Sequence, residues 1–225
     1  MRTVPCAGLT LALVVALIGA GPAWAVPLTF SGTVVDAAGH PVADAQVVAM
    51  VVAPPNSTAL TVFKTDAAGA FAFQSEPFAY DPRATSRAVL AHKSGLAMAL
   101  GSAEAGKPLV LTLGDKPEQR SGVVLGPDGK PLAGVPVRAT WVFQTESSGT
   151  NTPLTASLPP SEAAPATDAQ GRFSFPGFAP GMGVFVIVEV EGCAGATIRI
   201  TDTTPVTVAL KPEATVSGRV LVNGQ

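Results

Sequence analysis

Two stretches of nine residues match each other: Thr65-Asp-Ala-Ala-Gly-Ala-Phe-Ala-Phe73 and Thr167-Asp-Ala-Gln-Gly-Arg-Phe-Ser-Phe175. In both, an aspartate and a glycine three residues later precede two phenylalanines that alternate with smaller residues. Aspartate at the start of a type I turn accepts backbone N–H groups, and glycine at its end adopts positive φ. The pattern therefore predicts a β-hairpin with a bulge, and it assigns both aspartates to the turn rather than to calcium binding.

The surroundings of this pattern are repeated as well. Upstream, Phe30–Ala45 matches Arg120–Val135, and a third start appears at Val216–Val222. Downstream, Leu109–Leu113 matches Val206–Leu210. Each copy is about 90 residues long, which is the size of one small β-sandwich and too long for one solenoid repeat.

This repetition predicts the domain organisation. We expect residues 26–117 and 118–213 to form two β-sandwiches, and residues 214–225 to be the first strand of a truncated third copy. A strand without partners exposes unpaired backbone N–H and C=O groups, which tend to pair with another strand. Val216–Val222 is therefore expected to pair back on the preceding module or to exchange with a neighbouring chain by β-augmentation. The more economical interpretation is that it begins the next module of a longer array.

Apolar residues alternate with polar ones in the period of β-strands. About seven short strands are expected in each copy, and no helix beyond the N-terminal segment. The predicted fold is all-β, in the form of tandem seven-stranded, Ig-like Greek-key sandwiches. The side chains expected to face the core are Phe30, Val34, Val47, Ala49, Val51, Phe71, Phe73, Val137, Ala139, Trp141, Phe173 and Phe175. Trp141 is thus predicted to lie in the core rather than on a sugar-stacking surface.

The N-terminus has the form of a secretory signal peptide. Arg2 precedes an apolar run over Leu9–Ala20, and Ala23-Trp24-Ala25 supplies a cleavage site. A run of about 12 residues is too short for a membrane span, which needs about 20. The protein is therefore expected to be cut after Ala25, to retain no membrane span, and to be secreted, periplasmic or on the cell surface. Cys193 would then be the one remaining cysteine, without an internal disulfide.

Composition argues against several functions. Hydrophobic residues make up 47% of the chain, charged residues 13%, and the net charge is −2, whereas a nucleic-acid surface would be basic. Two histidines and two cysteines leave few ligands for zinc or haem. Tyr80 is the single tyrosine, so an intradiol dioxygenase, with two tyrosine and two histidine iron ligands, does not fit. The chain also lacks zinc-peptidase and serine-nucleophile motifs, so we expect no catalytic residues, no metal and no cofactor.

Comparison of the two copies gives an expectation for single candidate residues. His40 aligns with Lys130 and His92 aligns with Glu189, which predicts that both histidines are exposed to solvent. Cys193 aligns with a leucine in the first copy, which predicts a small buried apolar side chain rather than a reactive thiol.

Two predicted loops remain as places for binding, because loops on a rigid sandwich commonly carry function. The first contains Phe78, Tyr80 and Arg83, and these three residues are the candidate contacts to a ligand or partner. The second, Gln144–Ala166, is polar and proline-rich and is interpreted as a tolerated insertion.

The order of these motifs resembles the carboxypeptidase regulatory-like domain family. The resemblance rests on Asp36–Val47 with Thr65–Phe73, and on Gly126–Val137 with Thr167–Phe175. It implies a transthyretin-like, seven-stranded sandwich. Members of this family accompany peptidase domains, occur in tandem on secreted bacterial proteins, or precede outer-membrane receptor barrels, and they are generally non-catalytic.

Three functional hypotheses follow. The first is a secreted, non-enzymatic tandem sandwich that acts as a scaffold or a protein-interaction module. The second is an adhesin that binds carbohydrate or a cell surface through exposed aromatic residues such as Phe78 and Tyr80. The third is the accessory N-terminal region of a larger secreted hydrolase or outer-membrane receptor. The expected partner is accordingly a protein or a cell-surface glycan.

Overall fold

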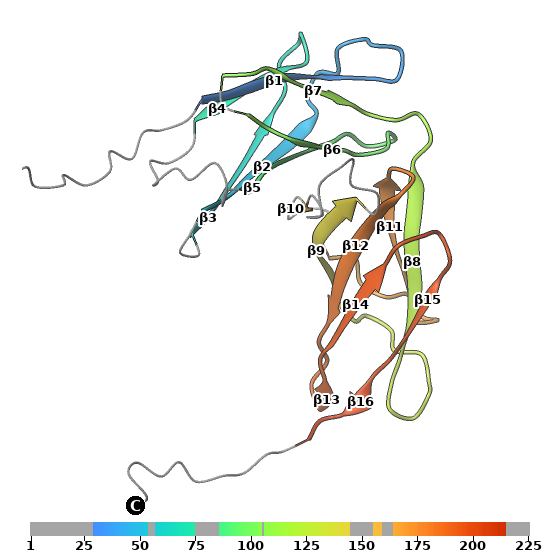
Figure 1. Cartoon of the computed structure of the whole chain (residues 1–225). Coiled ribbons are helices and arrows are strands. Elements are labelled where there is room, and N and C mark those ends of the chain that lie inside the picture. Colours follow the sequence, from blue (N-terminus) through green and yellow to red (C-terminus); the bar gives the residue numbers. More distant parts are fainter. Residues whose placement is uncertain are drawn as a thin grey trace, which may run out of the picture.

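The computed structural model describes residues 29–53, 57–74, 86–104, 106–144, 155–158 and 164–214. Within these ranges the chain forms sixteen β-strands and no helix (Figure 1). The predicted all-β sandwich fold is thereby confirmed. No helix in the described ranges has the length and apolarity needed to cross a membrane. The predicted signal peptide, the residues Phe78, Tyr80 and Arg83, and the strand Val216–Val222 lie outside the described residues.

The first seven strands form two facing sheets, which we call the N-terminal sandwich. These strands are β1 (Thr29–Val35), β2 (Gln46–Ala53), β3 (Ser57–Lys64), β4 (Ala70–Gln74), β5 (Ser86–His92), β6 (Ala99–Ser102) and β7 (Leu109–Thr112). They pair in the orders β4-β1-β7 and β3-β2-β5-β6. The pair β1–β7 is parallel, and the other pairs are antiparallel.

The remaining strands form the C-terminal sandwich, whose sheets repeat this order. They are β8 (Glu118–Leu125), β9 (Val137–Gln144), β10 (Thr155–Ser157), β11 (Arg172–Phe178), β12 (Met182–Val188), β13 (Cys193–Ala194), β14 (Ala196–Ile200), β15 (Val206–Ala209) and β16 (Lys211–Pro212). The two main sheets have the orders β11-β8-β15 and β10-β9-β12-β14, and β13 pairs with β16. Again the first and last long strands, β8 and β15, are parallel.

The alternating phenylalanines fill the space between the sheets as their period predicts. Phe71 and Phe73 on β4 are buried, as are Phe173 and Phe175 on β11. Phe30 on β1 stacks on Phe73 with ring centroids 4.9 Å apart. Cys193 is a free thiol that lies half-buried against the core of the C-terminal sandwich.

The two predicted β-hairpins do not form, because the strands on either side of each turn lie in different sheets: β3 pairs with β2 and β4 with β1, and β10 pairs with β9 and β11 with β8. The turns themselves have the predicted chemistry. The Oδ1 atoms of Asp66 and Asp168 each accept the backbone N–H groups two and four residues later, at 2.8–2.9 Å. Gly69 and Gly171 close these turns with φ angles of 69° and 71°. The assignment of the aspartates to turn formation is confirmed.

A buried threonine immediately before each of these turns was not singled out from the sequence. The Thr65 hydroxyl accepts the N–H of Ala45 at 2.9 Å and donates to the carbonyl oxygen of Val42 at 2.6 Å. Thr167 makes the equivalent two hydrogen bonds at the same lengths. Both copies therefore contain a buried polar bridge between this turn and the segment that precedes the second strand of the copy.

The N-terminal sandwich buries both faces of its four-stranded sheet. Val47 and Ala49 on β2 face the inner core, whereas Val48 and Met50 on the opposite face are 1% exposed. This second face belongs to one continuous apolar cluster with the C-terminal sandwich. Figure 1 shows β9, β10 and β12 lying below the sheet that contains β2 and β5. The nearly unbroken apolar run of β2 is typical of a strand that is covered on both sides.

Candidate functional site

Trp141 does not lie in the core, so that prediction is wrong. On β9, Ala139 pairs with Val186 and Trp141 pairs with the preceding residue, Phe185. Thr140 is therefore an extra residue, which makes a β-bulge. A one-residue insertion reverses the faces of all later side chains, and Trp141 is consequently turned outward with 38% of its surface exposed.

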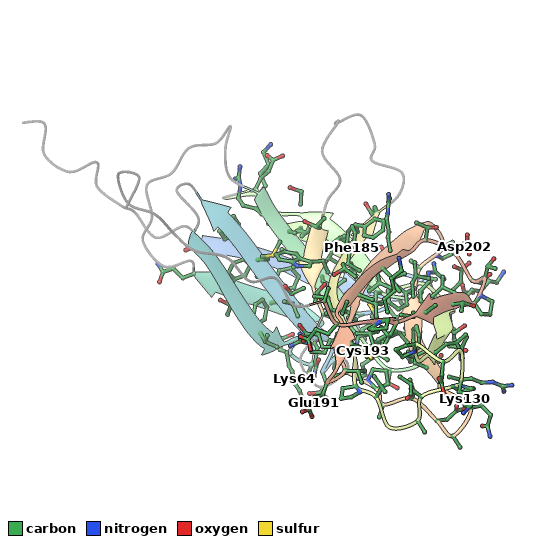
Figure 2. The ribbon with its side chains drawn as sticks, turned by 90° about the horizontal axis from the view of Figure 1, so that it is seen from below. Lys64, Lys130, Phe185, Glu191, Cys193 and Asp202 are labelled. Carbon is green, nitrogen blue, oxygen red and sulfur yellow. The ribbon has the colours of Figure 1, made fainter. Side chains whose placement is uncertain are left out.

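Trp141 belongs to a row of side chains that crosses the whole sheet. Ser157 on β10 pairs with Trp141, Trp141 with Phe185 on β12, and Phe185 with Arg199 on β14. We call these four residues the aromatic row; Phe185 is labelled in Figure 2. Their neighbours Val142, Val184 and Val186 are completely buried in the core. Because side chains alternate along a strand, the row faces outward.

Phe143 lies beside this row and contacts two of its residues. Its ring lies 4.9 Å from that of Phe185, and the guanidinium carbon of Arg199 lies 4.4 Å from its centroid. Phe143 is only 2% exposed, although it points to the outer side of the sheet. It fits there because Gly183 is opposite: a Cβ atom at Gly183 would lie 2.3 Å from the Phe143 ring. Phe143 thus holds Phe185 and Arg199 in place through ring contact and a cation–π interaction.

The charged groups near the row differ in their pairing. Arg138 donates to Glu189 at 2.7 Å, so this exposed pair is neutral as a whole. Arg199 contacts the Phe143 ring, and no carboxylate of the described ranges forms an ion pair with it. A guanidinium placed in this way has donors free for a negatively charged group.

The equivalent face of the N-terminal sandwich is buried and apolar. Both sheets carry four central outward positions that correspond in the alignment of the two copies, with Thr140 at the bulge. The N-terminal residues are Val48, Met50, Ala88 and Leu90, and their C-terminal counterparts are Arg138, Thr140, Phe185 and Ile187. The first set is apolar and at most 1% exposed, because it is covered by the other sandwich. The second set contains two polar residues, the aromatic Phe185 and the aliphatic Ile187, and all four are exposed or half-exposed to solvent.

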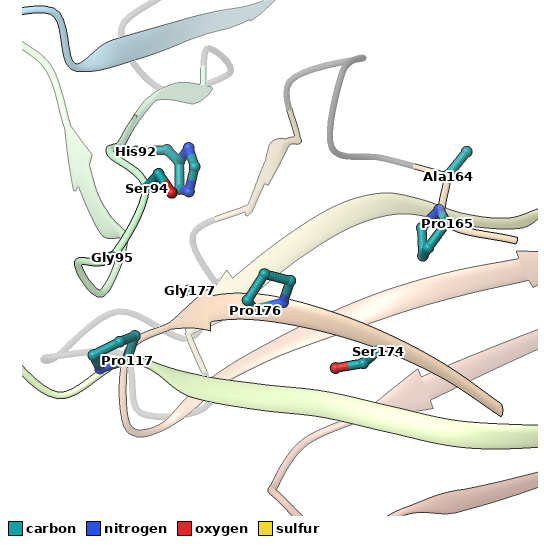
Figure 3. A pocket seen from close by; sticks show the side chains of 9 residues that line it. All are labelled: His92, Ser94, Gly95, Pro117, Ala164, Pro165, Ser174, Pro176 and Gly177. Carbon is teal, nitrogen blue, oxygen red and sulfur yellow. The ribbon is translucent and has the colours of Figure 1, made fainter. Parts of the chain in front are cut away.

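A pocket of about 340 Å³ lies at the junction of the two sandwiches (Figure 3). His92 and Ser94 line it from the N-terminal side, and Ser174, Pro176 and Gly177 line it from β11. His92 is only 5% exposed, so its predicted exposure is wrong. Its counterpart in the other copy is exposed because no further sandwich in the described ranges covers that position.

The junction pocket has little of the chemistry of an active site. Its polar lining consists of one imidazole and two serine hydroxyl groups, beside prolines and glycines. His40, the other histidine, is exposed as predicted and contacts Asp36 at 3.2 Å in a distant turn. The described ranges contain no group of three histidine, cysteine or carboxylate side chains that could hold a metal ion.

A second, shallower hollow of about 730 Å³ lies on the outer face of the sheet β11-β8-β15. Ser121, Arg172 and Thr207 line it from the three strands. It shares Pro165 and Ser174 with the junction pocket, so the two hollows are adjacent. Its lining lacks an exposed aromatic ring, which distinguishes it from the aromatic row.

No protein-family model and no curated protein matches this sequence. Among solved structures, the shaft pilin SpaA from Lactobacillus rhamnosus GG is similar, with 12% identity and a TM-score of 0.35 over 85% of this chain and 100% of the pilin. The minor pilin GBS52 from Streptococcus agalactiae has 14% identity and a TM-score of 0.33, over 85% and 99% of the two chains. The major pilin RrgB from Streptococcus pneumoniae has 12% identity and a TM-score of 0.30, over 84% and 48%.

Proposed function

We propose that this protein is a non-catalytic, extracytoplasmic scaffold whose two carboxypeptidase regulatory-like sandwiches act as one rigid unit. The observation that carries the proposal is the apolar cluster shared by both sandwiches. Interfaces between domains of one chain are commonly small and polar, and such domains move relative to each other. Here the centre of the covered face of β2 and β5 is apolar, and the buried His92 lies at its edge, beside the junction pocket.

Backbone and side-chain contacts reinforce this junction. The N–H of Met98 donates to the carbonyl oxygen of Gly177 at 2.7 Å, and Gln144 Nε2 donates to the carbonyl oxygen of Leu100 at 3.4 Å. Both bonds connect the N-terminal sandwich to the C-terminal one. Their donors and acceptors have defined directions, so they specify the orientation that the apolar contact alone would leave open.

A buried arginine shapes the C-terminal side of the junction. Arg120 is fully buried, donates to the carbonyl oxygen of Met182 at 2.7 and 3.0 Å, and pairs with Glu118 at 2.9 Å. Its guanidinium carbon lies 5.3 Å from the ring centroid of Phe178. Phe178 and Met182 both belong to the shared cluster. Arg120 therefore holds the turn between β11 and β12 against the N-terminal sandwich.

The location and the absence of catalysis in this proposal rest on the sequence. The N-terminal segment has the form of a signal peptide, and the chain lacks nucleophile and zinc-peptidase motifs. The repeated turn and strand motifs support membership of the carboxypeptidase regulatory-like family.

The rigid unit is tested by measuring urea unfolding with a tryptophan reporter in each sandwich separately. In the protein from residue 26 onward, Trp141 is the single tryptophan and reports on the C-terminal sandwich. A Val62→Trp/Trp141→Phe variant moves the reporter to β3 of the N-terminal sandwich, where Val62 is 46% exposed. We expect both reporters to give one urea midpoint, because the two halves share a core.

The interface variant Met50→Glu provides the contrast. A charge at this buried position separates the halves, so the two midpoints should diverge in this background. Val110→Glu, on a 61% exposed residue of β7, is the matched control and should leave the midpoints together. Different midpoints in the protein without an interface substitution would show that the sandwiches are independent, and would overturn the proposal.

A further inference from the structure

We propose that the aromatic row of the C-terminal sandwich binds a glycan that carries carboxylate groups, such as a polyuronate. The row is formed by Ser157, Trp141, Phe185 and Arg199, on the outer face of the sheet β10-β9-β12-β14. The inference goes beyond the scaffold role, because it gives the rigid unit a ligand.

The aromatic part of the row suits the apolar face of a sugar ring. Trp141 exposes 38% of its surface, and Phe185 beside it is half-buried. Indole rings provide flat, rigid contact area at a low cost in conformational entropy. Phe143, packed over Gly183, contacts Phe185 from the side, so ordering of this surface on ligand binding costs little conformational entropy.

The charged end of the row suits a carboxylate. Arg199 lies two strands away from Trp141, a backbone separation on the order of 10 Å. A sugar stacked on Trp141 therefore places a following residue of the same chain near Arg199. Guanidinium groups bind carboxylates with two parallel hydrogen bonds, and the ring of Phe143 keeps this guanidinium in one position.

The composition of the face favours a glycan over a protein partner. Where this fold uses the equivalent face to bind a protein surface, it presents valine, methionine, alanine and leucine, all buried. The open face instead presents Thr140, Thr197 and Arg138 around its aromatic centre, with Ile187 as its aliphatic residue. Charged residues are depleted from the cores of protein interfaces, whereas hydroxyl and guanidinium groups can hydrogen-bond to a polyhydroxylated ligand.

Titration of the protein from residue 26 onward with an alginate hexasaccharide tests this site, with maltohexaose as the neutral probe of the same length. We expect saturable binding of the alginate probe, seen as a change in Trp141 fluorescence and as heat in calorimetry. Binding should weaken at ~0.5 M salt, because the ion pair is screened. Maltohexaose should bind about tenfold more weakly, because it offers Arg199 no carboxylate.

Variants separate the two parts of the row. Trp141→Ala should lower alginate affinity about tenfold or more in calorimetry, whereas Trp141→Phe should retain most of it. Arg199→Gln should abolish the preference for alginate over maltohexaose. Val110→Ala and Arg172→Gln, exposed residues on other sheets, should change neither affinity. Circular dichroism establishes that each variant is folded.

Three results would overturn the proposal: absence of saturable alginate binding, equal affinity of Trp141→Ala and the parent protein, or equal affinity for both probes. Sedimentation velocity gives a fourth such result. In it, alginate does not bind, the protein self-associates, and Trp141→Ala abolishes the self-association. The face would then bind a second copy of the chain rather than a glycan.

Discussion

The backbone N–H of Met98 donates a 2.7 Å hydrogen bond to the carbonyl oxygen of Gly177, and this bond joins the two sandwiches. Met98, Leu158 and Phe178 line a small apolar cavity on one side of it, and Gly177 faces the junction pocket with His92 on the other. The bond has a defined direction, which an apolar contact does not. The contact therefore contributes both to stability and to the orientation of the halves.

Substitution of Met98 by alanine should destabilise the whole protein. The change removes a side chain that is 2% exposed and enlarges the cavity lined by Leu158 and Phe178. We expect a loss of about 2–4 kcal/mol in the free energy of unfolding, measured with urea. Val62→Ala, at an exposed position of β3, is the control and should change this free energy by less than about 0.5 kcal/mol. A loss for Met98→Ala as small as that of the control would contradict the packed junction.

Loss of the buried guanidinium should be more costly than loss of an exposed one. Arg120→Ala leaves the carbonyl oxygen of Met182 without its donor and Glu118 without its partner. A reduction of about 3–5 kcal/mol in the free energy of unfolding is expected. Arg172→Ala, whose side chain is exposed on β11, should be nearly neutral. Similar unfolding midpoints for both variants would argue against the role of Arg120.

The two internal threonine bridges should be of equal importance. Thr65→Val and Thr167→Val each remove a hydroxyl that accepts one hydrogen bond and donates another, and each leaves a backbone N–H unpaired. We expect about 1–3 kcal/mol of destabilisation from either change. The double variant should show the sum, because the sites are far apart. Thr112→Val, at an exposed position of β7, controls for the loss of a hydroxyl.

Lowering the pH should remove the stabilisation that the ionised Asp36 carboxylate gives to its turn. The backbone N–H of His40 is the main cause that lowers the pKa of Asp36 below its ordinary value of 3.8, and the His40 side chain and the Ala38 N–H add to it. A carboxyl whose pKa is lowered in the folded state stabilises the protein above its unfolded pKa. That stabilisation is lost as the pH falls through the lowered value.

The Asp36→Asn variant should therefore differ most from the parent protein at neutral pH. The difference in urea midpoint should shrink as the pH is lowered through 3.8 and below. Asp115→Asn, at an exposed aspartate, serves as the control. A difference that grows in acid would show that the sign of this linkage is wrong.

The repeated motifs allowed much of the fold to be predicted. Strand period and turn chemistry are local, so Phe71, Phe73 and the Asp66–Gly69 turn lie where the sequence places them. The orientation of Trp141 could not be predicted in this way. One extra residue in β9 reverses it, and the bulge is defined only by the pairing with β12.

The junction also escaped prediction, because it depends on contacts between the copies rather than within one. The alignment of His92 with Glu189 predicted exposure, yet the C-terminal sandwich covers His92. One signal was present in the sequence: β2 is apolar at Val48 and Met50 as well as at Val47 and Ala49. Such a run indicates a sheet covered on both faces.

The parallel pairing of the first and last long strands of each sandwich determines how the molecule responds to a pulling force. Tension applied at the two ends of a sandwich acts along β1 and β7, or along β8 and β15, in opposite directions. The hydrogen bonds between such strands run across the direction of pull and must break together, in shear, rather than one after another. Each sandwich should accordingly resist extension well.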